Sequence, residues 1–280
     1  MSGPLLEARQ IGLGYSRPQG WQTVLEGFDL QLQAGEVVSI LGPSGVGKSS
    51  LLRVLAGLQK PHQGQVSLRG EALDGPHPRV AVAFQDPSLL PWLSLEKNVA
   101  FGLDFARQPV LSVAERKVRI DHAINAVGLQ HAREQYPAQL SGGMAQRTAL
   151  ARCLARQPQV LLLDEPFGAL DEVTRADMQA LLLKVIREHN TAAVLITHDI
   201  DEALLLSERI LLLGNSPART LGEWRIDLPQ PRAELVEELG TLRIEILKTL
   251  RRASRNPDLQ PLPESPETPH VPGRLHPHAS

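Results

Sequence analysis

A glycine-rich loop between a strand-like run and a helix-like run is the feature that most constrains how this chain can fold. Apolar residues dominate the run from Glu36 to Leu41 before the loop, and a helical apolar spacing follows it from Leu51 to Ala56. Between a strand and a helix, the pattern G-x-x-x-x-G-K-[ST] cradles phosphate groups. The alternative is a glycine-rich surface turn with an incidental lysine, and the two flanks favour the phosphate-binding loop. The residues expected to bind a nucleotide here are Gly42, Pro43, Ser44, Gly45, Val46, Gly47, Lys48, Ser49 and Ser50.

The loop residues match the chemistry of a nucleoside triphosphate. Glycines let the backbone turn with positive φ and approach a ligand without a Cβ in the way. Free N–H groups at the start of the following helix favour a bound anion. Lys48 is expected to reach the β- and γ-phosphates as a point charge, and Ser49 to hold Mg²⁺ through its hydroxyl.

Composition limits the remaining classes of protein. Of 280 residues, 42% are hydrophobic and 21% are charged, which indicates a globular chain with room for a large core. A net charge of -2 argues against a strongly basic nucleic-acid binder. Cys153 is the only cysteine, so a disulfide within the chain is excluded and a buried thiol in a reducing compartment is expected. The N-terminus lacks a signal-peptide layout and no apolar segment approaches roughly 20 residues, so a membrane role is expected only through a partner.

Strands and helices alternate along the chain, which predicts an α/β fold: a P-loop NTPase core with a parallel sheet. Short runs punctuated by glycines before the loop, and another after the first helix, predict an antiparallel β subdomain. From about residue 94 to 155 the pattern is mainly helical with breaks at Pro109, Gly128 and Pro137, so a helical subdomain is expected to be inserted at about 88–157. The expected strands are Leu6–Leu13, Phe28–Gln33, Val37–Leu41, Gln65–Arg69, Arg79–Phe84, Val160–Leu163, Ala192–Thr197 and Arg209–Leu213, and the expected helices after the insertion are Asp171–Glu188 and Asp201–Ser207.

The C-terminal part is expected to lie outside the nucleotide-binding domain, which is assigned to residues 1–230. A charged amphipathic helix is predicted over 232–252, within a segment assigned to 231–255, and it receives no function from the sequence. Residues 256–280 are rich in Pro, Ser and His and are expected to be disordered, with the histidines solvated rather than bound to metal. The apolar positions of the predicted helix are Leu235, Leu239, Leu242, Ile246 and Leu250.

Two acidic residues follow the apolar run Val160–Leu163. Ligands of parallel α/β sheets bind at the carboxyl ends of the strands, so beside a phosphate loop Asp164 is expected to hold Mg²⁺, usually through water. Glu165 is placed to accept a proton from the water that attacks the γ-phosphate. The alternative is a helix-capping aspartate with a solvent-facing glutamate, which the independent phosphate loop disfavours.

A second helix start and one aromatic complete the candidates. Ser141 is an N-cap residue type, and with Gly142 and Gly143 it opens a helical run, so a second anion-binding helix start is expected. Because one loop already serves one nucleotide, this start predicts either a second ligand or the nucleotide of a partner chain. Tyr15, expected on a loop after the first strand, either stacks on an adenine or is an ordinary half-buried aromatic.

Together these stretches resemble the ATP-binding subunit of an ABC transporter over about residues 5–215. Within that family, Phe84–Trp92 and Asn98–Leu103 are similar to importers of nitrate, aliphatic sulfonates and taurine, and transporters of thiamine-precursor pyrimidines share much of this pattern. Met144 and Ala145 depart from commoner signature residues without touching the serine and glycines before them. The matches in chain order are the adenine-stacking Tyr15, Walker A at 42–49, the Q-loop Gln85, the signature Ser141-Gly142-Gly143, Walker B ending at Asp164-Glu165, the D-loop Gly168-Ala169-Leu170-Asp171 and the switch His198.

The resemblance implies a mechanism and a set of partners. Two copies would pair head to tail, so that each ATP lies between one chain's phosphate loop and the signature of the other. The implied partners are an integral-membrane permease, a second copy and, indirectly, an extracytoplasmic solute-binding protein, with a peripheral position on the cytoplasmic face of the inner or plasma membrane and no nucleic acid. The implied roles are catalysis for Glu165, His198 and Gln85, Mg²⁺ coordination for Ser49, Gln85 and Asp164, and a contact near the nucleotide for Asp171.

Two other functions and one surface stay open at this point. A soluble ABC ATPase acting on ribosomes or DNA usually carries tandem cassettes or long coiled-coil insertions, and neither is visible in the sequence. A regulatory module without turnover commonly lacks the base, so Glu165 argues against it. Leu89, Leu90, Trp92 and Leu93 either receive a cytoplasmic helix of the permease or form the core of the helical insertion.

Overall fold

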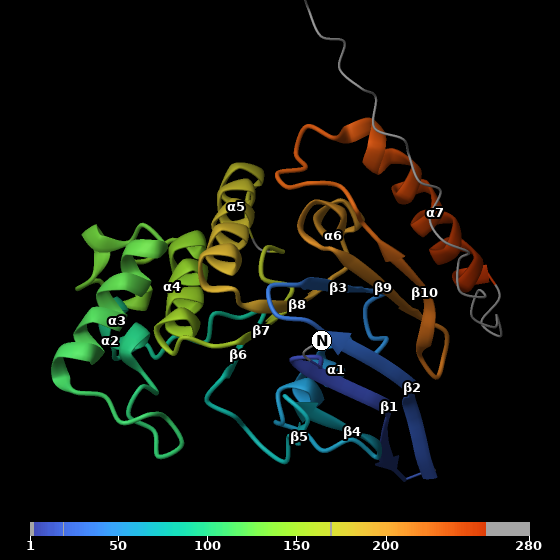
Figure 1. Ribbon diagram of the computed structural model, residues 1–280, viewed down its shortest axis with the longest axis horizontal. Coiled ribbons are helices and arrows are strands. Elements are labelled where there is room, and N and C mark those ends of the chain that lie inside the picture. Colours follow the sequence, from blue (N-terminus) through green and yellow to red (C-terminus); the bar gives the residue numbers. More distant parts are fainter. Residues whose placement is uncertain (1–2, 19, 169, 256–280) are drawn as a thin grey trace, which may run out of the picture.

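The computed structural model describes residues 3–18, 20–168 and 170–255. The predicted disordered tail, 256–280, and Ala169 of the expected D-loop lie outside these ranges. Within them the chain is an α/β P-loop core with a mainly parallel sheet, an antiparallel sheet and an inserted group of helices (Figure 1). This is the fold class expected from the sequence.

The central sheet has six strands in the order β10-β9-β3-β8-β7-β6. All neighbours pair in parallel except β10, which runs antiparallel to β9. The continuous apolar runs of β3, β7 and β8 follow from burial on both faces of the sheet. β10 was not predicted, because its residues mix charge and glycine on an edge strand. The bounds are β3 Val37–Leu41, β6 Val80–Ala83, β7 Val160–Asp164, β8 Ala192–Thr197, β9 Arg209–Gly214 and β10 Arg219–Arg225.

The antiparallel sheet has the order β2-β1-β4-β5 and is longer than the sequence predicted. Pairing of the first two strands continues to Arg17 opposite Gly20, with register shifts between Ala8 and Gly14 that absorb the glycines. The prediction that the first strand ends at Leu13 is therefore wrong, because these glycines sit within a twisted hairpin and do not end it. The bounds are β1 Leu6–Arg17, β2 Gly20–Leu32, β4 Gln63–Leu68 and β5 Glu71–Ala72.

Seven α-helices are present among the described residues, and the predicted helical insertion contains three of them. Local caps explain several of the starts: the Ser112 side chain and Glu115 form a reciprocal capping box at α3, and Ser94 caps α2. The predicted C-terminal helix begins only at Val236, because residues 232–235 form the turn that leads into it. The bounds are α1 Lys48–Leu55, α2 Leu95–Ala100, α3 Val113–Ala126, α4 Gly142–Ala155, α5 Glu172–His189, α6 Ile200–Leu206 and α7 Val236–Arg255, with 3₁₀ turns at Gln130–Ala132 and Pro137–Gln139.

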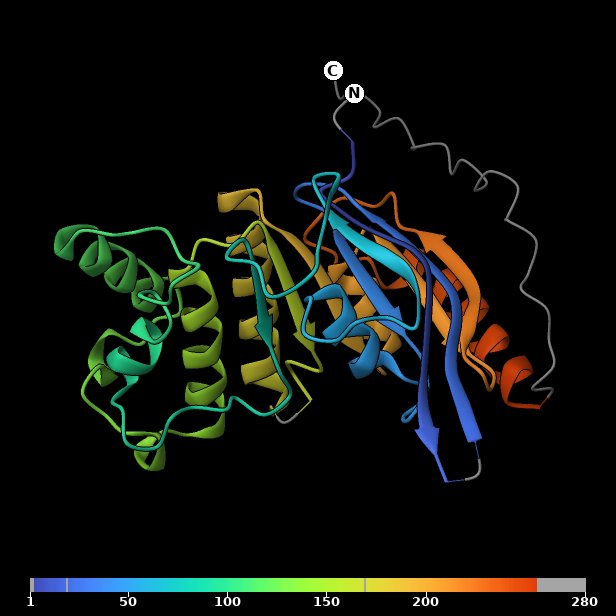
Figure 2. The ribbon, with the colours of Figure 1, turned by 90° about the horizontal axis from the view of Figure 1, so that it is seen from below.

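The central sheet separates two of the three apolar cores. Val38 and Ile40 of β3 pack with α1 and the antiparallel sheet, whereas Val37 belongs to the core that includes α4 and α5. A third core joins α6 and α7 to β9 and β10. Both views show α2, α3 and α4 grouped on one side of the molecule, beyond α5, with the antiparallel sheet and α7 on the other (Figure 2). In the part of the chain described, no helix combines the length and hydropathy that a membrane crossing requires.

Candidate functional site

The phosphate loop runs from the end of β3 to the start of α1, as predicted. Pro43, Ser44 and Gly45 at its tip are exposed, whereas the flanking β3 is wholly buried. Gly47 precedes α1 with φ 103, and no side chain caps the helix start. The first N–H groups of α1 are therefore left to a ligand, which is the arrangement that binds phosphate.

Two glycines of the loop are required for different physical reasons. Gly47 has a positive φ, and a Cβ there would lie 2.8 Å from Cγ1 of Val24. Gly42 has ordinary torsions, but a Cβ would lie 2.8 Å from the carbonyl oxygen of Leu213 in β9. Gly42 therefore permits close packing of the loop on the sheet, whereas the sequence interpretation assigned the glycines to turning and ligand approach.

The Lys48 side chain is folded back on its own loop. Its Nζ donates to the carbonyl oxygens of Gly42 at 2.7 Å and Pro43 at 3.0 Å, and the residue is 5% exposed. Burial lowers the pKa of the ammonium group, while the negative charges of Glu165 and Asp164 oppose that change. A phosphate beside this buried ammonium would supply the countercharge that two carbonyl dipoles only partly provide.

Ser49 and Asp164 meet across the gap between α1 and β7. Ser49 Oγ donates to Asp164 Oδ1 at 3.2 Å. Burial raises the pKa of Asp164, as does the charge of Glu165, while the Ser49 hydrogen bond and Lys48 favour ionisation. A hydroxyl and a buried carboxylate, both hard oxygen donors, suit Mg²⁺, which keeps several water ligands and contacts few protein groups. The residues present therefore fit the metal expected from the sequence.

Glu165 and His198 come together at the ends of two neighbouring strands. β7 and β8 pair in parallel, and the Glu165 backbone N–H donates to the carbonyl of Ile196 at 2.9 Å. Glu165 has φ 45, an uncommon value for a residue with a side chain, and strained backbone of this kind clusters at functional sites. His198 Nδ1 lies 3.4 Å from Glu165 Oε1. The histidine side chain is 60% exposed and the carboxylate 19%, so the pair faces solvent from the histidine side.

Tyr15 lies next to the phosphate loop, although its predicted location on a loop is wrong. It is part of β1, and its hydroxyl forms a 2.7 Å hydrogen bond with Ser50 Oγ in the first turn of α1. The residue is 40% exposed. An aromatic ring anchored at its hydroxyl and open to solvent is a suitable stacking surface for a flat base.

The expected signature residues lie on a different part of the molecule from the phosphate loop. Ser141 caps α4 by accepting from the N–H of Met144 at 3.2 Å, and Ser141 and Gly142 are exposed. Figures 1 and 2 both place α4 with the inserted helices, away from α1. A Cβ at Gly143 would lie 2.8 Å from Cγ2 of Thr174, so this glycine permits the approach of α4 to the start of α5. Within one chain, the signature does not join the phosphate loop.

Asp171 and Gln85 were also predicted to be site residues. Asp171 caps α5: its carboxylate accepts from the N–H of Thr174 at 3.0 Å and from its hydroxyl at 2.7 Å, and the latter bond is the main cause of its lowered pKa. Gln85 is exposed on the loop after β6. The structure therefore gives Asp171 a capping role and leaves the side chain of Gln85 at the surface.

Arg152 is a structural link to the Gln85 loop that sequence reasoning missed. Its guanidinium donates to the carbonyls of Ser88 at 2.9 Å and Pro87 at 2.8 Å. One turn further along α4, Arg156 donates to the carbonyl of Val80 at 3.4 Å. These bonds tie the helix that follows the signature to β6 and the loop after it. The spacing of the two arginines on one helix was the only sequence signal, and it does not reveal their acceptors.

Comparison with known proteins places the chain in a family. The sequence model described as ABC transporter matches residues 25–168. The aliphatic sulfonates import ATP-binding protein SsuB 2 of Burkholderia lata is 45% identical over 257 residues, covering 91% of this chain and 89% of that protein. The bicarbonate transport ATP-binding protein CmpC of Synechocystis sp. is 45% identical over 241 residues, and these are 84% of this chain but 36% of that longer protein.

A solved structure agrees with the sequence relatives. The dimeric ATP-binding cassette MJ0796, in a post-hydrolysis state bound to ADP and Pi, has a TM-score of 0.71 and 30% identity, covering 80% of this chain and all of that one. Fold, phosphate loop and sequence similarity agree with the resemblance expected from the sequence. The chain therefore belongs to the ABC transporter family, in which it is an ATP-binding cassette of the ATP-hydrolysing kind.

Proposed function

We propose that this chain hydrolyses ATP to power a membrane importer for a small solute. The observation that carries the proposal is the convergence of four side chains at the carboxyl ends of the parallel strands: the Ser49–Asp164 hydrogen bond and the Glu165–His198 pair, beside the phosphate loop. The carboxyl ends of parallel strands are where α/β sheets bind ligands. Phosphoryl transfer requires mainly positioned charges and one proton acceptor, and this cluster offers both.

In this proposal the loop amides and Lys48 bind the phosphates, while Tyr15 stacks on the adenine. The phosphates take the place of the two loop carbonyls that the Lys48 ammonium contacts. Ser49 and Asp164, with Gln85 brought in from its loop, would hold Mg²⁺, which when bound would supply positive charge to the β- and γ-phosphates.

Glu165 is proposed as the general base and His198 as the group that orients the attacking water and γ-phosphate. The carboxylate is partly shielded from water, and it lies in contact with the imidazole that would hold the same water. A base must lie within hydrogen-bond reach of the proton that it removes, which a single bound water between these residues and the γ-phosphate would satisfy.

The distance of the signature from the loop supports action in trans. Ser141 and Gly143, exposed or half-buried at the start of α4, are proposed to bind the γ-phosphate held by a second copy. The closed dimer then depends on the γ-phosphate. Loss of the γ-phosphate removes the contact with the partner's signature, which is formed in the closed dimer and not in the open one. Asp171 is proposed to stabilise the same interface from its position at the start of α5.

The names of the relatives support a proposal for the solute and the partners. Because the compared ATP-binding proteins are described for aliphatic sulfonates and bicarbonate, we propose a small solute of the nitrate, sulfonate or taurine kind, moved by an integral-membrane permease. The chain would lie on the cytoplasmic face of the membrane, and an extracytoplasmic binding protein would deliver the solute. The sulfonate and bicarbonate names favour such a solute over a thiamine-precursor pyrimidine.

The loop after Gln85 is the proposed contact with the permease. Trp92 is 69% exposed there, while Leu89 and Leu90 are half-buried. Arg152 ties this loop to α4, so a push on it would be transmitted to the signature. Trp92→Ala in the complete transporter is expected to leave the melting temperature unchanged and to uncouple ATP hydrolysis from uptake. Undiminished uptake by the variant would refute this contact.

The function itself is tested by steady-state ATP hydrolysis of the purified chain and of the membrane complex that copurifies with it. Glu165→Gln is expected to bind ATP with unchanged affinity and to lose at least about a hundredfold in kcat. A wild type no faster than this variant would indicate a regulatory module without turnover. Copurification with ribosomes instead of a membrane protein would indicate the soluble alternative.

A further inference from the structure

We propose that the C-terminal segment, residues 226–255, holds helix α6 at both ends and thereby positions His198 for ATP hydrolysis. The segment lies outside the stretch matched by the family sequence model, residues 25–168. The inference rests on the hydrolytic role of His198 proposed above, and it assigns to α7 a function that the sequence did not indicate.

The first contact is a buried arginine at the carboxyl end of α6. Arg232 is 2% exposed. Its Nη1 donates to the carbonyl oxygens of Ser207 at 2.6 Å and Leu204 at 3.2 Å. These carbonyls belong to the last turn and the end of α6, where a helix leaves carbonyls unpaired and a positive charge is favourable. Arg232 therefore caps α6 although β9 and β10 separate the two along the chain.

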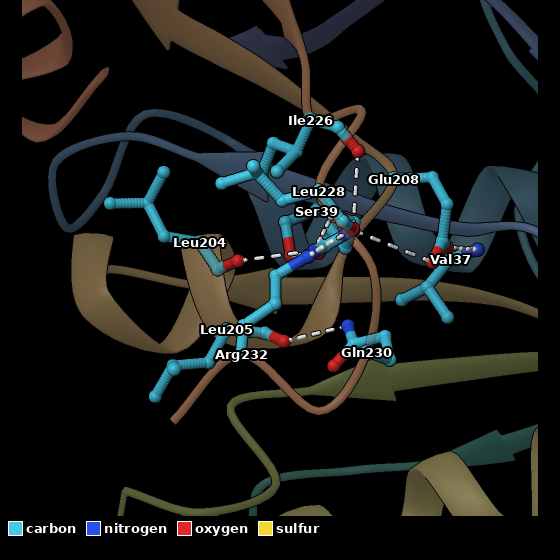
Figure 3. A network of polar contacts seen from close by, with 10 residues as sticks. Val37, Ser39, Leu204, Leu205, Glu208, Ile226, Leu228, Gln230 and Arg232 are labelled. Atoms are coloured by element: carbon cyan, nitrogen blue, oxygen red, sulfur yellow. Dashed lines mark hydrogen bonds and ion pairs between the residues drawn. The ribbon is translucent and has the colours of Figure 1, made fainter. Parts of the chain in front are cut away.

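The same guanidinium orders the chain that leads to α7. Arg232 Nη2 donates to the carbonyl of Ile226 at 3.2 Å, and its Nε donates to that of Leu228 at 2.9 Å (Figure 3). Gln230 adds a 2.8 Å bond from Nε2 to the carbonyl of Leu205. These bonds hold the connection against α6, because breaking them would leave buried carbonyl oxygens without a hydrogen-bond partner, which costs free energy.

The cap is also continuous with the strand that carries the phosphate loop. Arg232 Nη2 lies 3.9 Å from Glu208 Oε1, and the other oxygen of that carboxylate accepts from the Val37 N–H at 2.8 Å. Ser207 forms a buried hydroxyl pair with Ser39. Val37 and Ser39 belong to β3, so the end of α6 is fixed relative to the loop that holds the nucleotide.

The second contact is an ion pair at the amino end of α6. Arg243, on α7, donates from Nε to Asp201 Oδ1 at 2.6 Å and from Nη2 to Oδ2 at 3.2 Å, a two-pronged ion pair. Asp201 is in the first turn of α6, three residues after His198. Between the two polar contacts, Leu239 and Ile246 of α7 are buried in the core that contains Ala203 and Leu204 of α6. The helix is held at its start, middle and end.

A short connection passes this constraint to the histidine. Asp199 caps α6 by accepting from the N–H groups of Asp201 and Glu202, and its own N–H donates to Thr197 Oγ1 at 3.0 Å. His198 lies between these two anchors, and its ring is 60% exposed. The one ion pair that the ring forms with a described residue is with Glu165, so the backbone on either side sets the ring's direction. A shift of α6 would therefore displace the imidazole from the carboxylate.

The test measures kcat and KM for ATP with the full-length chain, in its membrane complex, carrying Arg243→Gln. Exposed ion pairs contribute little to stability, so the variant should melt close to the wild type. We expect kcat to fall about two- to fivefold with KM unchanged. Arg251→Gln, an exposed arginine on the same helix, is the matched control and should change neither constant. The exchanged pair Asp201→Arg with Arg243→Asp should recover part of the lost kcat.

The decisive comparison adds the same change to His198→Ala. If α7 acts through His198, Arg243→Gln lowers kcat in the wild type and has no further effect in the His198→Ala chain. An equal fall in both backgrounds would overturn the inference in favour of a general structural effect. Loss of activity in His198→Ala with none in Arg243→Gln would overturn it while leaving the proposed function intact. Full activity in His198→Ala would instead remove the proposed role of the histidine, and the inference with it.

A second variant tests the inference in case the fall in kcat of Arg243→Gln is too small to measure. Arg232→Lys keeps the charge but cannot reach all four carbonyls, so we expect a lower melting temperature and about a tenfold loss of kcat below it. Wild-type kcat in Arg232→Lys, at a temperature where it is folded, would overturn the inference independently of Arg243.

Discussion

Glu202 provides a direct test of the electrostatics around His198, the proposed switch histidine. The residue lies on α6, is 5% exposed, and one of its carboxyl oxygens has no hydrogen-bond partner among the described residues. Burial raises its pKa from 4.5 to about 7, and the charge of Asp199 adds to this, while a hydrogen bond with Thr197 and the positive charges of Arg175 and His198 oppose it. The native protein therefore holds a proton here at a pH where the unfolded chain has released it.

The sign and size of the effect follow from linkage. A carboxyl whose pKa is raised on folding binds more protons in the native state, so it lowers stability as pH rises from about 4.5 to about 7. The whole rise in pKa corresponds to about 3 kcal/mol at 1.36 kcal/mol per unit. The penalty is absent below the lower value and complete above the upper one.

Glu202→Gln removes the titration while keeping the shape of the side chain. Urea unfolding of both proteins at about pH 5 and about pH 8 should show that the variant gains about 2.5 kcal/mol on the wild type between the two pH values. Titration of other groups and any constant cost of the amide cancel in this difference. A stability difference that stays the same within about 0.5 kcal/mol at both pH values would refute the assignment of a proton to Glu202.

Three further substitutions test the nucleotide site. Lys48→Ala should raise the Kd for ATP at least about tenfold in calorimetry, because a buried charge-assisted contact with phosphate is lost; unchanged affinity would exclude Lys48 as a phosphate ligand. Gly47→Ala should lower the free energy of unfolding by about 1–3 kcal/mol, since φ is positive and Val24 occupies the space of the new Cβ, and an unaltered urea midpoint would contradict this. Tyr15→Phe should keep the ATP affinity within about twofold, whereas Tyr15→Ala should weaken it about tenfold through lost stacking; equal affinities in the two variants would argue against the stacking role.

The parts of the fold that the sequence predicted are those with a local pattern. The buried strands β3, β7 and β8 read as short apolar runs, and a helix was expected after the phosphate loop from Leu51, although α1 begins at Lys48. Cys153 is buried, as its apolar surroundings indicated. Such features depend on neighbouring residues along the chain, so a reading of one sequence can locate them.

Features set by pairing across the chain were missed. The long hairpin of β1 and β2 contains Gly14, which sequence rules treat as a break, yet a Cβ there would lie 2.6 Å from the ring of Trp21. The glycine makes room for the indole on the neighbouring strand, and this places Tyr15 within a strand. β10 exists because it pairs with β9, and its own residues carry no clear strand signal.

The candidate site shows the same division between motif and context. Motifs identified Ser49, Asp164, Glu165 and His198, and the structure brings them together in pairs. The contacts of Arg232 could not be foreseen, because its acceptors are backbone carbonyls far from it along the chain. A backbone carbonyl has no sequence signature, so only the structure could show that this arginine caps α6.

The central claim, that two copies close on shared ATP, is tested most directly by the mass of the Glu165→Gln chain in solution. With ATP and Mg²⁺, light scattering after size exclusion should give a dimer, which reverts to single chains when ADP replaces ATP. Ser141→Arg in the same background should bind ATP and stay a single chain, because the signature then cannot accept the γ-phosphate of the partner. The account would be contradicted if Glu165→Gln with ATP bound kept the mass of a single chain, both as the isolated chain and when its membrane complex is present.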